Sequence, residues 1–334
     1  MEGDLWGTSG GKGYNGDNFW VADNPPFGAV FTYVLRDGLK SLADARRETE
    51  KDIQKAGGDT VYPSWEDLRA EDREDDPVIL VTISDSSGNI VRRFKAPQAK
   101  GLHRVAWDLR FETPDPARLK PAETPAFGNP AVGPMVLPGK YTVTLAKRIN
   151  GVVTPLSEPQ SFTVKALDQS PETAANRNEV LAFQQDTADI ARTVSGTLAA
   201  SSELRNRLAH LKVAVEALIV PNEAYRATLQ QIEAMIDEAE ISLTGDRTIS
   251  SRNEPTPRSI ASRVGQIRSW GWYNQSQPTQ SSKDAQAIAT KELGAVLTQL
   301  RDVETRLGSL ETELERLGAP YTPGRGVPSW SPQE

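Results

Sequence analysis

The chain has 334 residues, of which 45 are acidic and 38 basic, for a net charge of −7. With no basic cluster of the kind that phosphate backbones require, this balance argues against a nucleic-acid partner. No apolar run approaches the length of a membrane span. The absence of cysteine excludes disulfides and thiolate metal sites.

Residues 1–26 are rich in glycine and aromatic residues, including Phe19 and Trp20, and follow neither a helical nor a strand period. We interpret this segment as the edge of an upstream domain. Residues 7–11 match the GxSxG spacing and residues 11–16 match GxGxxG, but neither has the strand and helix that such motifs need. We interpret both as loop.

The segment 27–168 reads as short strands with an insertion at 39–77. An apolar strand is predicted at 27–35, because Pro25 and Pro26 fix φ and lack the N–H that a sheet requires. Within the insertion, the charged stretch 41–55 predicts a surface helix, and 62–77 predicts an acidic loop.

Strand patterns resume at Val78. A turn at Asp85–Asn89 separates two β-rich runs, and a second hairpin turns at Asn150-Gly151. The alternating run 102–109 places three apolar side chains on an inward face: Val105, Trp107 and Leu109. Six or seven such strands predict an all-β unit, an immunoglobulin-like or fibronectin-type sandwich.

Residues 172–318 predict an all-α unit, an antiparallel coiled-coil-like helical bundle. Apolar residues there recur at alternating steps of three and four, as in Leu204, Leu208 and Leu211, and later in Leu293, Val296, Leu300, Val303, Leu307, Leu310, Leu314 and Leu317. Because such a seam also fits a partner helix, a homodimer through 282–318 stays open. Residues 319–334 form a proline- and glycine-rich tail.

Five aromatic residues are candidates for ligand or domain docking: Trp270, Trp272, Tyr273, Phe19 and Trp20. Their rings would either stack on sugar or dock one part of the protein onto another. The two histidines, His103 and His210, are interpreted as structural. We predict no catalytic residue, no cofactor and no metal ligand.

Several segments resemble the C-terminal region of bacterial sortilin-like or BNR-repeat propeller proteins, commonly labelled glycosyl hydrolases. They are FWVADNPPFGAVFTYVL (19–35), residues 43–77 of the insertion, GLHRVAWDLR (101–110), PGKYTVTL (138–145) and LGAPYTPGRGVPSW (317–330). The two strand segments are also similar to the immunoglobulin-like domain of flagellar hook-capping proteins.

The resemblance implies a sandwich and a helical tail that follow a propeller, in an exported periplasmic or extracellular protein. This chain shows no repeats of propeller length and no SxDxGxxW motif, and its N-terminus lacks the basic and apolar regions of a signal peptide. We therefore expect a noncatalytic scaffold or interaction region, whose partner is an upstream propeller or another protein. The alternatives are glycoside hydrolysis by acids of the 62–77 segment, and carbohydrate binding without turnover.

Overall fold

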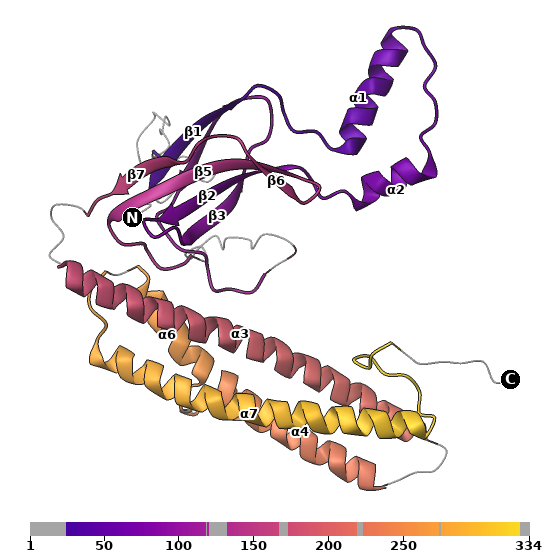
Figure 1. Ribbon diagram of the computed structural model, residues 1–334. Coiled ribbons are helices and arrows are strands. Elements are labelled where there is room, and N and C mark those ends of the chain that lie inside the picture. The colour runs from indigo at the N-terminus through magenta and orange to yellow at the C-terminus, as the bar shows by residue number, and fades with distance from the viewer. Residues whose placement is uncertain are drawn as a thin grey trace, which may run out of the picture. The chain divides into compact units, whose positions relative to one another are not determined.

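The computed structural model describes residues 25–117, 119, 132–166, 173–218, 223–273 and 275–327 (Figure 1). These residues form antiparallel sheets and seven helices. By its internal contacts the chain divides into two compact units. The first comprises Met1–Val81, Phe94–Leu109 and Leu145–Ser157, and the second comprises Thr82–Arg93, Arg110–Thr144 and Glu158–Glu334.

A two-stranded sheet joins β1 (Ala29–Leu35) to β4 (Gly101–Trp107), with Ala29 opposite Trp107 and Leu35 opposite Gly101. Both strands were predicted, and the alternation in β4 is confirmed, since Trp107 is buried while Leu102 and Arg104 are exposed. The prediction for Leu109 is wrong. The strand ends at Trp107, and Leu109 adopts a positive φ of 60° that a strand does not allow.

The other five strands form one sheet. They are β2 (Val78–Asp85), β3 (Ile90–Ala96), β5 (Gly139–Ile149), β6 (Val152–Pro155) and β7 (Gln160–Val164), in the order β3-β2-β5-β6, with β7 also paired to β5. Both predicted turns are confirmed. The Asp85 carboxylate accepts hydrogen bonds from the backbone N–H of Ser87 and Asn89, and Asn150 and Gly151 both adopt the positive φ that a two-residue hairpin needs.

The insertion contains two helices, α1 (Leu42–Lys55) and α2 (Trp65–Arg73). The first was predicted, but the prediction of a loop across 62–77 is wrong. The Ser64 hydroxyl accepts a hydrogen bond from the Asp67 backbone N–H, and this N-cap starts α2 despite its scarcity of apolar residues. Neither helix has a buried residue.

Ion pairs rather than apolar contacts hold α1 to α2. The guanidinium of Arg46 donates to both carboxylate oxygens of Glu71, at 2.6 and 2.9 Å, and to Glu50 at 2.7 Å. The carboxylate of Glu74 accepts a hydrogen bond from the backbone N–H of Leu42 at the start of α1. The helices are therefore connected mainly by polar bonds at the surface.

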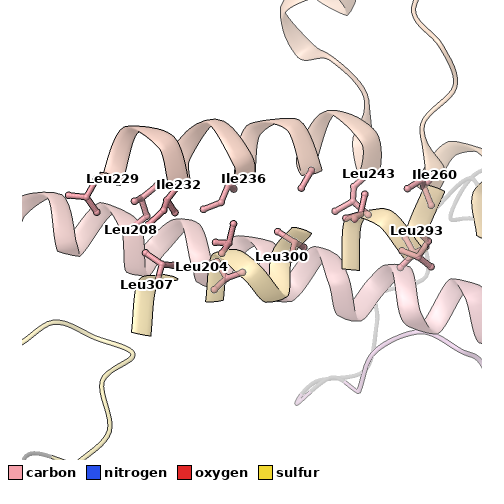
Figure 2. Close-up of a cluster of buried hydrophobic side chains, with 14 of the residues drawn as sticks. Leu204, Leu208, Leu229, Ile232, Ile236, Leu243, Ile260, Leu293, Leu300 and Leu307 are labelled. Atoms are coloured by element: carbon pink, nitrogen blue, oxygen red, sulfur yellow. The ribbon is translucent and has the colours of Figure 1, made fainter. Parts of the chain in front are cut away.

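The helical body consists of α3 (Ala174–Glu216), α4 (Glu223–Thr244), α6 (Ile260–Gly271) and α7 (Gln280–Arg316), while α5 (Arg247–Ser250) is a single turn. These four helices share one apolar core, whose side chains from all of them meet in Figure 2. The predicted seam is confirmed from Leu293 to Leu314 in α7. Leu317 is 47% exposed because the helix ends there.

The four helices form three columns: α3, α7, and α4 followed by α6. Ion pairs between α3 and α7 join residues that are separated by nearly the same number of positions in the sequence, as in Glu179–Lys283 and Arg207–Glu311. These two helices are therefore parallel. In the ion pairs between α3 and α4, residue numbers rise along α3 as they fall along α4, as in Arg205–Asp237 and Lys212–Glu233. Helix α4 is therefore antiparallel to α3. After α4 ends at Thr244, α6 continues along α3 in the direction of α4, antiparallel to α3 (Figure 1).

Polar residues interrupt the apolar seam of α3. Gln184, Thr187, Thr197 and Ser201 are all buried. The Gln286 side-chain amide donates to Thr187 Oγ1 at 2.9 Å, and the Ser201 hydroxyl donates to Glu240 at 3.1 Å. Because each of these bonds fits only one alignment, they fix the register of helices whose leucines alone would tolerate a slip.

The segment after α7 covers a buried ion pair. Arg207 and Glu311 form two hydrogen bonds of 3.0 and 2.7 Å, and their side chains are only 12% and 8% exposed. Gly324 lies directly against the Arg207 side chain, where a Cβ would come within 2.7 Å of Arg207 Cγ and Cδ. Only glycine allows this approach, so the described part of the tail, up to residue 327, belongs to the helical body.

We predict that Leu211→Ala destabilises the protein by about 2–5 kcal/mol, because Leu211 is completely buried in the shared core. The matched control is Val213→Ala on the same helix, which removes a side chain that is 69% exposed and should change stability by less than about 0.5 kcal/mol. Urea denaturation followed by circular dichroism measures both. Equal losses from the two variants would contradict the packing.

Candidate functional site

Three of the candidate aromatic residues lie together at the end of α6. Ser259 caps the start of this helix, and Trp272 lies at its C-terminal cap. The three candidate aromatic residues in this stretch have different environments. Trp272 is 3% exposed, Tyr273 is 47% exposed and Trp270 is 75% exposed. Phe19 and Trp20 lie outside the described residues.

Two side chains from distant parts of the chain hold this helix end, those of Arg110 and Gln184. Arg110 Nη1 donates to the carbonyl oxygen of Trp272 and to that of Gly133, each at 3.0 Å. Gln184 Nε2 donates to the carbonyl oxygen of Gly271 at 2.7 Å. The last carbonyls of a helix lack helical partners and carry partial negative charge, so a cationic donor there is favourable.

Arg268 supplies a further link. Its Nη2 lies 2.8 Å from Asp115 Oδ1, and its guanidinium carbon lies 4.6 Å from the ring centroid of Trp272. The guanidinium of Arg110 lies 5.6 Å from the ring of Tyr273. Both are cation–π contacts. Arg110, Asp115, Arg268 and Trp272 all belong to the second compact unit, where they join the segment after β4 to α6.

The buried indole of Trp272 is therefore part of an internal junction, whereas Trp270 is open to solvent. Sequence analysis did not single out Arg110, Asp115 or Gln184. Their partners lie 162, 153 and 87 positions away in the chain, and nothing in the local residue pattern marks such contacts.

The histidines do not come together in a site. His103 lies in β4, where its Nε2 is 2.6 Å from the carbonyl oxygen of Ala99 and its ring is 5.3 Å from that of Tyr33. His210 is exposed on α3. Over the residues that the structure describes, no three His, Asp or Glu side chains gather closely enough to hold a metal ion.

The acids of 62–77 were the candidates for glycosidase chemistry. Hydrogen bonds from Arg46 lower the pKa of the Glu71 carboxyl, whereas a general acid needs a raised pKa. Glu74 bonds the start of α1. A hollow beside α1 is lined by four basic and three acidic side chains: Lys40, Arg47, Lys51, Lys55, Asp44, Glu48 and Asp52. Pockets that hold small ligands are instead mainly apolar.

Comparison with family models, curated proteins and solved structures finds no match to the chain. None of the described helices is both long enough and apolar enough to cross a membrane.

We predict that Trp272→Ala destabilises the protein by about 3–5 kcal/mol, because it empties a buried aromatic site and removes the ring beneath Arg268. Trp270→Ala is the control, expected to change stability by less than about 0.5 kcal/mol. Thermal and urea unfolding compare the two. The junction would be refuted if Trp272→Ala were as stable as the control.

We also predict that the Glu71 carboxyl titrates below its ordinary value near 4.3, since Arg46 bonds its charged form. A lowered pKa means that the contribution of Glu71 to stability is complete above the ordinary value and is lost as pH falls through the lowered one. Carbon-detected NMR titration reports the midpoint. Arg46→Gln should raise it, and an unchanged midpoint in that variant would contradict the assignment.

Proposed function

We propose that this chain is a noncatalytic scaffold or interaction region that accompanies a propeller domain in an exported bacterial protein of the sortilin-like or BNR-repeat kind. In this proposal the two antiparallel sheets stack as an immunoglobulin-like sandwich, and α3, α4, α6 and α7 form a helical bundle. The segments quoted above, from residue 19 to residue 330, support the family assignment by their order along the chain.

One observation carries the noncatalytic part of the proposal. Several charged residues that chemistry could use are engaged in structural bonds: Glu71 with Arg46, Arg268 with Asp115, and Arg207 with Glu311. Each pair joins two segments of the chain, and no pair lines the hollow beside α1. The charged groups therefore serve to fix segments to one another.

Carbohydrate binding is the second candidate, and one residue favours it. Trp270 exposes three quarters of its surface beside the half-exposed Tyr273. An indole face can cover the apolar face of a pyranose ring, much as it covers other apolar surfaces. A single exposed indole lacks the convergent polar groups that would orient a sugar, so we rank this candidate below the scaffold role.

The two candidates and glycoside hydrolysis are separated by one set of assays on the full chain. We expect no release of product from a panel of polysaccharides and aryl glycosides, and no change in tryptophan emission on titration with oligosaccharides. Saturable quenching that is lost in Trp270→Ala and kept in Trp65→Ala would favour carbohydrate binding. Turnover that is abolished by Asp75→Asn or Asp76→Asn would establish an enzyme instead.

A further inference from the structure

The helix pair α1–α2 exposes aromatic surface that the described fold does not use. Val61, Tyr62 and Trp65 are 88%, 73% and 69% exposed, and the rings of Tyr62 and Trp65 pack edge to face at 6.1 Å. Both helices lack buried residues. Exposed aromatic groups gathered at a polar surface are typical of protein interfaces, where tyrosine and tryptophan supply contact area.

The same segment holds most of the net charge of the chain. Residues 42–76 contain twelve acidic and six basic residues, a net charge of −6 against −7 for all 334 residues. Several acids are paired with arginines or lysines, but Asp72, Asp75 and Asp76 are exposed. Within the described ranges, none of these three has a cation within 4 Å. The surface therefore favours a basic partner.

A basic segment of opposite character lies between α4 and α6. Residues 247–258 contain three arginines and one acidic residue, Glu254, and follow Asp246. Arg247, Arg252 and Arg258 are exposed, and among the described residues none of their guanidinium groups has a carboxylate within 4 Å. Ile249, in the same stretch, is 39% exposed. Arginine is the cation best suited to carboxylates and to aromatic faces.

We propose that these two surfaces bind each other between copies of the chain, with α1–α2 of one copy docked on residues 247–258 of the next. Carboxylates of Asp72, Asp75 and Asp76 would face the three arginines, and Trp65 would stack on a guanidinium. The contact is heterologous, so each copy keeps one unused surface, and assembly either closes into a ring or extends. This contact does not depend on the scaffold role.

Because the charged groups are exposed, the association should be weak and strongly sensitive to salt. We expect sedimentation velocity of the full chain to show an average mass that rises with protein concentration at about 20 mM salt. At about 500 mM salt, where the screening length falls to a few ångströms, the mass should return to that of the monomer. A monomer at every concentration in low salt would overturn the proposal.

Reversing the charges on each surface tests whether the two proposed surfaces bind each other. Asp72→Lys with Asp75→Lys and Asp76→Lys, and separately Arg247→Glu with Arg252→Glu and Arg258→Glu, should each weaken self-association by about tenfold or more, since like charges then face each other. Mixing the two variants should restore association. The matched control reverses three exposed acids of α7, Glu292, Glu304 and Glu315, and should associate more tightly than either variant.

Three outcomes would contradict the assignment. The first is equal weakening by the α7 control, which would mean that net charge alone matters. The second is a failure of the two variants to associate when mixed, and the third is a salt-dependent change in hydrodynamic radius at constant mass, which would indicate a contact within one copy. Circular dichroism checks that each variant is folded. Neutral variants of the same residues, Asp→Asn on one surface and Arg→Gln on the other, change the charge less, and each should also weaken self-association.

Discussion

Packing of the apolar seams of α3, α4, α6 and α7 into one core is the constraint on which the rest of the helical body depends. Ile232, Ile236, Leu243, Leu307 and Leu314 are completely buried there. No single helix of this composition would be stable alone, because helices in proteins gain most of their stability from an apolar face that is covered. Since the seam of α7 is covered within its own chain, a dimer through residues 282–318 would need another surface of that helix.

The polar bonds of the body follow from this packing. Once α6 continues the path of α4 along α3, its last carbonyls come within reach of Gln184 and Arg110. The buried Arg207–Glu311 pair contributes little net stability, since its desolvation offsets much of its attraction. It does penalise any other alignment of α3 against α7, as do the buried bonds of Thr187 and Ser201.

The periodic elements could be predicted from the sequence, whereas the long-range contacts could not. The leucine spacing identified α3, α4 and α7, and the turns at Asp85–Asn89 and Asn150-Gly151 identified two hairpins. Helix α2 was missed because its charged sequence has no apolar period, although Ser64 followed by Asp67 is a capping pattern. The parallel course of α3 and α7 depends on α6 continuing α4 across a polar break, which no local pattern encodes.

One apolar core orders the helical body, whereas α1 and α2 have no buried residue and are held by ion pairs. Native-state hydrogen exchange measures this directly. We expect amides of α3, α4 and α7 beside the seam to exchange only through global unfolding, and amides of α1 and α2 to exchange through low-energy local opening. Protection of α1 and α2 equal to that of the seam, or fast exchange along the seam, would contradict it.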